Sequence, residues 1–280
     1  MKVGMNLLLW LTHLTEVHYP LLENLRKIGF DGVEVPLGEG DAAHYQAVGK
    51  ELDNFGLERT TIFSLDAQTN SISPDPAIRQ ASVDRLKWAI DMNAALGSST
   101  MGGPFHSAFK EFSGEPPTED EAKWAAEVLY QAAEHAKAAG VTLAIEALNR
   151  FECYFVNTIQ MSKAFVQRVN HPNLQLMYDT HHSNIEEKSP TAAIQHCADV
   201  LAHVHISESD RGTPGTGQVN WAENFKALKS INYDRWLVIE AFSTVIPDFA
   251  YAINVWRNFD PAEEISKNGH DFVRRMWAET

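Results

Sequence analysis

Short β-prone runs alternate with longer amphipathic runs along this chain, and this alternation constrains the fold more than any other feature. The expected strands are Val3–Leu9, Gly32–Leu37, Arg59–Ser64, Ser99–Gly103, Thr142–Glu146, Leu174–Tyr178, Ala202–Ile206 and Trp236–Ala241. The expected helices between them are Pro20–Ile28, Ala42–Phe55, Pro76–Leu96, Thr118–Ala139, Thr158–Val169, Pro190–Asp199 and Trp221–Ser230, with an eighth that begins near Asp248. Such an alternation predicts parallel strands joined by helical crossovers.

Glycine and proline mark the boundaries of these runs. A glycine ends four of the helical runs and precedes a strand: Gly29, Gly56, Gly97 and Gly140. Glycine accepts the left-handed backbone of a helix C-terminus. A proline stands at three expected helix starts: Pro20, Pro76 and Pro190. Proline suits the first helical turn, where its missing amide hydrogen is not needed.

The expected strands are apolar on both faces, as in VTLAIEAL and RWLVIEAF, until a carboxylate interrupts them. This pattern is typical of parallel strands that are covered on both sides. We therefore expect residues 1–280 to form one (β/α)8 TIM barrel. A doubly wound open sheet is the alternative, but its glycine-rich phosphate turn is missing after NLLLWLTH. We expect Asp260–Glu279 to add a helical segment outside the barrel or against a partner subunit.

Composition excludes several classes of protein. The chain has 280 residues, 44% of them hydrophobic, and a formal charge of −14, which disfavours a nucleic-acid partner. We expect no membrane span, because no apolar run reaches the length of about 18 residues that a bilayer requires. The start MKVGMNLLLWL is expected to be a buried strand and not a signal peptide. Two cysteines without a CxxC motif fit a reducing, cytoplasmic location.

Four residues with metal-binding side chains fall at or just past the ends of the last four expected strands. They are Glu146, Asp179, His205 and Glu240, and they lie between about 26 and 35 residues apart. Each gap equals roughly one strand plus one helix, so a barrel brings all four to one rim. Three carboxylates would repel one another there unless a cation lay between them. Three oxygen donors and one imidazole, without a thiolate, favour Mn²⁺, with Mg²⁺ or Co²⁺ as alternatives.

Each of these residues also has an ordinary structural interpretation. A single carboxylate at a strand end is most often a helix N-cap or part of a surface salt bridge. A single histidine, as in AHVHIS, is most often a core residue with satisfied hydrogen bonds. Four such residues in register on adjacent strands make a shared metal site the better interpretation.

The residues around these positions resemble a known family. IEALNRFECYFVNT, MYDTHHSNIEE, HVHISESDRGTPGTGQVNW and VIEAF are similar, in this order, to the strand-5 to strand-8 motifs of the D-tagatose 3-epimerase and D-psicose (allulose) 3-epimerase family. That family, which includes L-ribulose 3-epimerases, belongs to the xylose isomerase-like barrels. KVGMN and GFDGVEVPLGE also fit, so the resemblance spans essentially the whole chain.

The resemblance implies one Mn²⁺-type ion held by Glu146, Asp179, His205 and Glu240, and a catalytic pair formed by Glu146 and Glu240. It also implies contacts with the C1–C3 end of a sugar from Glu152, His182 and Arg211. The chain departs from the family at Asn6, where relatives often carry an aromatic residue, at Ala147, and at Gln218 and Asn220. We expect Asn6 to contact the substrate. The family suggests a homodimer or homotetramer.

The implied reaction, inversion at C3 of a ketose, needs residues of these types. Removal of the C3 proton beside the C2 carbonyl gives a cis-enediolate, and a metal ion stabilises its negative charge. The proton must return on the opposite face, so two bases are needed, one on each side. Glu146 and Glu240 would flank a sugar that lies across the barrel mouth. Trp10 and Phe105, near two strand ends, would either form an apolar wall of the pocket or pack in the core.

Three other functions stay open on the sequence. An aldose–ketose or hydroxypyruvate-type isomerase would use the same barrel and metal but exchange protons at C1 or C2. A metallonuclease barrel would need more histidine ligands and a basic surface, which the charge of −14 disfavours. A sugar-binding barrel would bind metal and ketose without any exchange.

Overall fold

Eight parallel strands pair in chain order and close into a barrel in a computed structural model, which describes residues 1–257 and 259–280. The strands are β1 (Lys2–Asn6), β2 (Gly32–Pro36), β3 (Glu58–Ile62), β4 (Thr100–Gly103), β5 (Thr142–Glu146), β6 (Leu174–Asp179), β7 (Leu201–Ile206) and β8 (Trp236–Ile239). β8 pairs with β1 and completes the ring. The prediction of a (β/α)8 barrel is confirmed.

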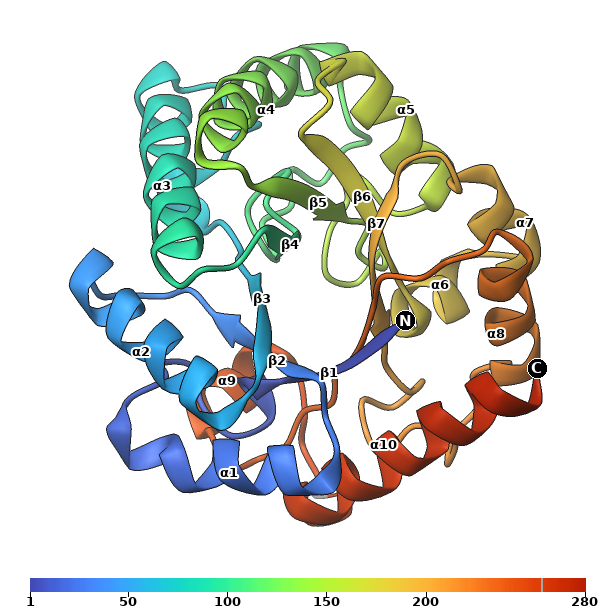
Figure 1. Cartoon of the computed structure of the whole chain (residues 1–280). Coiled ribbons are helices and arrows are strands. Elements are labelled where there is room, and N and C mark those ends of the chain that lie inside the picture. The colour runs from blue at the N-terminus through green and yellow to red at the C-terminus, as the bar shows by residue number, and fades with distance from the viewer. Residues whose placement is uncertain (258) are drawn as a thin grey trace.

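Helices surround the barrel on its outside (Figure 1). They are α1 (Tyr19–Ile28), α2 (Ala42–Phe55), α3 (Pro76–Ala95), α4 (Glu119–Ala139), α5 (Ile159–Val169), α6 (Thr180–Glu186), α7 (Pro190–His196), α8 (Trp221–Ser230), α9 (Pro247–Ala252) and α10 (Ala262–Glu279). The boundary signals of the sequence act as expected. Gly29, Gly56 and Gly140 are left-handed C-caps, and a proline lies in the first turn of α1, α3 and α7.

Two elements differ from the expectation for local reasons. The first strand ends at Asn6 and not at Leu9, because the Asn6 side chain accepts a hydrogen bond from the amide of Leu8 and starts a 3-10 turn over Leu7–Leu9. The short helix α6 was not expected from its polar sequence. It begins directly after β6, where the carboxylate of Asp179 caps it by accepting from the amide of His182.

A helix begins near Asp248 as expected, but it does not cover the last part of the barrel. The helix near Asp248, α9, is only six residues long, and its Ala250 packs with Phe242 and Val255 in a small cluster separate from the main core. The C-terminal helix α10 packs instead between α8 and α1 and contacts β1 and β8 (Figure 1). The amphipathic segment at the end of the chain therefore completes the ring of helices around the barrel.

Other features of the chain agree with its composition. In residues 1–257 and 259–280, no helix combines the length and apolarity that crossing a bilayer requires. Cys153 and Cys197 are both buried and free. Burial raises the pKa of the Cys197 thiol to about 12, so this thiol is inert at neutral pH.

Candidate metal centre

Four side chains from adjacent strands meet at the C-terminal rim of the barrel. Glu146 and Asp179 are the last residues of β5 and β6, His205 lies near the end of β7, and Glu240 follows β8 directly. Asp179 and His205 are direct partners in the register of β6 and β7. All four are at least 96% buried. The structure thus brings together the four residues that the sequence predicted as metal ligands, at the end of the barrel where such folds carry their active sites.

The ligand atoms of these residues surround a common point. The Nδ1 atom of His205 lies 3.3 Å from Oε1 of Glu240, 3.7 Å from Oδ2 of Asp179 and 3.9 Å from Oε1 of Glu146. Suitable ligand atoms of all four residues lie within 4.8 Å of one another. Ligands bound to a divalent ion at about 2.1 Å are about 3.0–3.4 Å apart. Small side-chain movements would therefore bring these atoms to the spacing of ligands on one divalent ion.

The hydrogen bonding of the cluster fits a cation. Among the described residues, no hydrogen-bond partner exists for Glu146 Oε1, Asp179 Oδ2 or His205 Nδ1, although all three atoms are buried. Buried polar atoms are nearly always paired, so three adjacent unpaired atoms of these types fit ligands of a cation. His205 Nε2 lies 2.7 Å from a carboxylate oxygen of Glu34, so a neutral ring would keep its proton on Nε2 and offer the Nδ1 lone pair to a metal ion. Burial lowers the pKa of His205, but Glu34 and Glu240 outweigh it and raise this pKa well above 6.5, so the ring is positively charged when no metal ion is bound.

Burial and mutual repulsion perturb the three carboxylates unequally. Burial raises the pKa of Glu146 well above its usual value, and the charges of Glu240 and Asp179 add to this effect. Burial also raises the pKa of Asp179 to about 6. Burial acts in the same direction on Glu240, but the positive charges of His205 and Arg211 outweigh it and lower the pKa of Glu240. Glu146 and Glu240 thus differ in their affinity for a proton.

Arg211 provides the permanent positive charge of the cluster. Its Nη1 donates to Glu240 Oε2 at 2.6 Å and to Ser207 Oγ at 2.9 Å, and it lies 3.6 Å from Asp179 Oδ2. The residue has a left-handed backbone, with φ of +67°, in the segment between β7 and α8. Its guanidinium group also lies over the ring of Phe242. Arg211 is therefore held in one place between the carboxylates and the wall of the cavity.

His182 lies beside Arg211 on the floor of the cavity. Its Nδ1 accepts from the backbone amide of Asn149 at 3.0 Å. Nε2 lies 3.0 Å from Nη2 of Arg211 and 3.7 Å from Oε1 of Glu146. Burial, reinforced by the charge of Arg211, holds the pKa of His182 well below 6.5, so the ring stays neutral. Glu152 is held nearby by the side-chain amide of Asn149.

A cavity of about 250 Å³ opens above the metal-ligand atoms. Its polar part is lined by Glu146, Glu152, His182, Arg211 and Glu240. The remaining wall is mainly apolar and includes Leu8, Leu37, Ile62, Phe63, Phe109, Phe242, Phe249 and Ile253. Most of the predicted substrate contacts therefore line one face of a pocket that has a polar floor and apolar walls.

Asn6 does not line this cavity. Its side chain is wholly buried, and its amide nitrogen donates to Glu34 Oε2 at 3.0 Å and to Glu240 Oε1 at 3.2 Å. Its amide oxygen accepts from the backbone of Leu8. All polar atoms of Asn6 are thus engaged with protein groups below the cavity floor, where the residue contacts a predicted metal ligand and not the open pocket.

Several residues of the site escaped the sequence analysis. Glu34 interrupts the apolar strand GVEVP as Glu146 interrupts its own strand, so the same signal of a carboxylate in a buried strand was available. Of the two alternatives for Trp10 and Phe105, the structure shows core packing: Phe105 is wholly buried in the core, Trp10 packs against the core, and neither lines the cavity. The aromatic rings that do line it come from connecting segments and from α9, whose paths a strand–helix pattern does not predict.

Comparisons with known proteins agree with this arrangement. Residues 22–276 match the family described as xylose isomerase-like TIM barrel. The ketose 3-epimerase of Arthrobacter globiformis is 34% identical over 98% of this chain and 96% of its own length. A solved structure of L-ribulose 3-epimerase superposes with a TM-score of 0.95 at 31% identity, covering 99% of this chain and 95% of that chain. The D-allulose 3-epimerase from Methylomonas sp., solved in complex with D-allulose, gives a TM-score of 0.92 at 29% identity, with 99% and 97% coverage.

The matched region contains all four metal-ligand candidates and seven of the eight strands from β2 onward. The likeness to the Arthrobacter relative extends over nearly the whole of both chains. The chain therefore belongs to the xylose isomerase-like TIM barrel family and, within it, to the ketose 3-epimerases, a group of isomerases that act on ketoses.

Proposed function

We propose that this protein is a metal-dependent ketose 3-epimerase that inverts C3 of a free ketohexose or ketopentose of the D-tagatose, D-psicose/D-fructose or L-ribulose type. One observation carries the proposal. Glu146 and Glu240 reach the same cavity floor from β5 and β8, and each belongs to a cluster whose unpaired buried acceptors fit a cation. The relatives named as ketose, L-ribulose and D-allulose 3-epimerases support the substrate class.

The proposed cofactor is Mn²⁺, with Mg²⁺ or Co²⁺ as alternatives. Glu146, Asp179, His205 and Glu240 would hold it, because three carboxylates and one imidazole without a thiolate match the preferences of these ions. When bound, the ion supplies positive charge that stabilises the enediolate formed by loss of the C3 proton. It also offsets the mutual repulsion of the three carboxylates.

The two glutamates would carry out the proton transfers. One carboxylate removes the proton from C3, and the other delivers a proton to the opposite face of the same carbon. The unequal environments of Glu146 and Glu240 support this division of roles, because burial raises the pKa of Glu146 while His205 and Arg211 lower that of Glu240. Pairs of acids with diverging pKa values are typical of acid–base sites.

Three further residues would hold the substrate. Arg211 is a donor on the cavity floor, the Glu152 carboxylate is an acceptor there, and the imidazole of His182 lies beside Arg211. Together they would bind the oxygens at the C1–C3 end and fix the orientation of C3 between the two glutamates. For Asn6 we propose a different task from the substrate contact that the sequence suggested, because its amide holds Glu240 from below the floor.

An aldose–ketose or hydroxypyruvate-type isomerase is the alternative function on the same barrel. It would share the metal and the cavity but move a proton between C1 and C2. The test is incubation of the Mn²⁺-loaded protein with a panel of ketohexoses and ketopentoses in D₂O, with the position of deuterium read by NMR. We expect deuterium at C3 together with the C3 epimer. Deuterium at C1 or C2 with aldose formation supports the alternative, and exchange at no carbon of any ketose overturns the proposal.

We also propose that the protein works as a homodimer or homotetramer in the cytoplasm. Large apolar side chains are exposed at Phe151, Val245, Tyr251 and Trp256, of which Tyr251 and Trp256 contact each other, and exposed apolar patches are typical of subunit interfaces. The free state of both cysteines fits a reducing compartment. Light scattering coupled to gel filtration measures the assembly directly, and a monomer at micromolar concentration contradicts this part of the proposal.

A further inference from the structure

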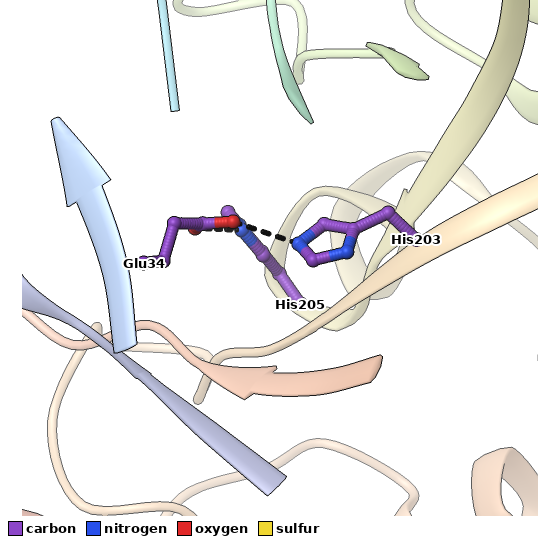
Figure 2. Close-up of side chains that lie close together, drawn as sticks. All are labelled: Glu34, His203 and His205. Carbon is purple, nitrogen blue, oxygen red and sulfur yellow. Dashed lines mark hydrogen bonds and ion pairs between the residues drawn. The ribbon is translucent and has the colours of Figure 1, made fainter. Parts of the chain in front are cut away.

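A second cluster of polar side chains lies directly beneath the candidate metal centre. Glu34 on β2 faces His203 and His205 on β7 (Figure 2). The Nε2 atom of His205 lies 2.7 Å from Oε2 of Glu34, and the Nε2 atom of His203 lies 2.8 Å from Oε1. All three side chains are wholly buried. The carboxylate therefore joins one predicted metal ligand to a second histidine deeper in the barrel.

Two more donors complete the surroundings of Glu34. Thr60 Oγ donates to its Oε1 at 3.0 Å, and the amide nitrogen of Asn6 donates to its Oε2 at 3.0 Å. Each oxygen thus accepts two hydrogen bonds, and a carboxylate has about four acceptor positions in total. With every position filled by donors from β1, β3 and β7, the carboxylate is held in one orientation in the barrel.

These contacts are hydrogen bonds and not the coordination shell of a second metal ion. The separations of 2.7 and 2.8 Å between Glu34 and the two histidines are normal for charge-assisted hydrogen bonds. They are shorter than the roughly 3.0–3.4 Å expected between two ligands of one ion. At the candidate metal centre the corresponding separations from His205 are 3.3 to 3.9 Å.

We propose that Glu34 is a positioning residue for the metal centre. By accepting the Nε2–H of His205 it directs the Nδ1 lone pair toward Glu146, Asp179 and Glu240. Through Asn6, whose amide nitrogen also donates to Glu240 Oε1 at 3.2 Å, it steadies a second ligand. The inference rests on the metal centre of the proposed function and assigns to Glu34 and Asn6 a supporting role that the sequence analysis expected of no residue.

The physical reason lies in the imidazole ring. A neutral imidazole carries one proton, and a nitrogen that carries it cannot bind a metal ion. An acceptor at Nε2 selects the tautomer that leaves Nδ1 free and also fixes the plane of the ring. Partners of this kind typically change metal affinity by about 10–100-fold when they are replaced.

Glu34→Gln is the test variant. Glutamine has the same shape, but its single amide oxygen cannot serve both histidines, and its NH₂ group opposes one of the two Nε2–H groups. Titration of metal-free protein with Mn²⁺ by calorimetry should show about 10–100-fold weaker binding by this variant than by the wild type. Raising the Mn²⁺ concentration should then recover part of its lost epimerase activity.

Thr61→Val is the matched control. Thr61 is also wholly buried on β3, but its hydroxyl donates to Asn93 Oδ1 at 2.7 Å, on the outer side of the barrel. We expect this variant to lose stability while its Mn²⁺ affinity stays within about threefold of the wild type. A merely structural role for Glu34 would make both variants behave like this control.

A second measurement does not depend on the folding of any variant. A crystal structure of the Mn²⁺-loaded wild type should show the ion on His205 Nδ1 and Glu34 within hydrogen-bond distance of Nε2. Two results overturn the inference while leaving the metal centre intact: an unchanged Mn²⁺ affinity in Glu34→Gln, or a loaded structure in which Glu34 has left His205. Failure of the wild type to bind Mn²⁺ overturns the metal centre itself.

Discussion

The carboxylate of Glu208 anchors the segment that carries Arg211. Replacement of Glu208 by glutamine tests whether its hydrogen bonds hold this segment in place. Oε1 accepts from the amides of Ser209 and Val219 at 2.8 and 3.1 Å. Oε2 accepts from the amide of Gly215 and the indole of Trp221, both at 2.9 Å. Glu208 is wholly buried, so each of these donors depends on it.

The magnitude follows from the count of acceptors. In Glu208→Gln one oxygen keeps its pair of donors, and the other pair faces an NH₂ group that cannot accept. A buried donor left without a partner costs about 1–3 kcal/mol, so two of them cost about 2–6 kcal/mol. We expect a decrease of about 3 kcal/mol in the free energy of unfolding, because the segment can open locally and reach water.

Urea denaturation of the metal-free protein, combined with hydrogen exchange over residues 208–221, measures both effects. The variant should unfold at lower urea concentration, its segment should exchange faster, and kcat should fall because Arg211 loses its anchor. Glu127→Gln, an exposed change in the middle of α4, is the control and should stay near the wild type. A decrease below about 0.5 kcal/mol with wild-type exchange in the segment would refute the reasoning.

The pH dependence of this difference has a definite sign. Burial acts to raise the pKa of Glu208, but the hydrogen bonds from Ser209, Val219, Trp221 and Gly215 outweigh it and lower the pKa below 4.5. A carboxylate with a lowered pKa in the folded state stabilises the protein above its unfolded pKa, and this contribution is lost as the pH falls. The gap in stability between wild type and Glu208→Gln should therefore narrow as the pH drops below about 4.5.

Three further predictions concern the site and its supports. Arg211→Met leaves the Glu240 carboxylate without its buried partner and should cost the metal-free protein about 3–5 kcal/mol in urea denaturation. The cost should be smaller with Mn²⁺, and equal costs in EDTA and in Mn²⁺ would argue against a cation there. Gly103→Ala should prevent stable folding, since φ is +131° and the new Cβ would lie 2.0 Å from a backbone oxygen. Its control, Gly114→Ala, has φ of +82° and no atom within 4 Å of the new Cβ, so it should lower the stability measured by thermal denaturation by only about 1 kcal/mol. The Cys197 thiol, with a pKa of about 12, should react with Ellman's reagent only after unfolding, and rapid reaction of the native protein would show that the site is open.

The sequence predicted the strands well and brought the four candidate metal ligands to one rim, because both follow from local rules. Apolar runs bounded by glycine and proline specify the eight strands. A carboxylate or histidine at the end of such a run specifies a rim position, as for Asp179, whose direct partner in the sheet is His205. Barrel closure then needs no further information, because parallel strands in chain order bring all their C-terminal ends together.

The residues that act between distant strands were harder to predict. Asn6 was expected in the pocket, but its amide is satisfied by Glu34 and Glu240, which lie 28 and 234 positions away in the chain. Glu34 contacts His205 across 171 positions. Such contacts depend on whether a side chain faces the inside or the outside of the closed barrel. A pattern of strands and helices does not determine this direction until the register of the strands is known.

The same limit applies at the C-terminus. The amphipathic pattern of α10 indicated a helix that buries one face, but not against what. The structure shows it packed beside β1 and β8, between α8 and α1, because α9 is too short to cover that part of the barrel. The longer helix α10, and not the shorter α9, therefore completes the ring of helices around the barrel.

The claim that two carboxylates act on opposite faces of one carbon is tested most directly by single replacements of each. Glu146→Gln and Glu240→Gln, both first checked for retained Mn²⁺, are incubated in D₂O with each of the two C3 epimers of an accepted ketose. The account predicts that neither variant converts one epimer into the other at more than a small fraction of the wild-type rate. Each variant should exchange the C3 proton of one epimer only, and the two variants should select opposite epimers. Near-normal epimerisation by either variant, or exchange of the same epimer by both, would contradict the two-base mechanism.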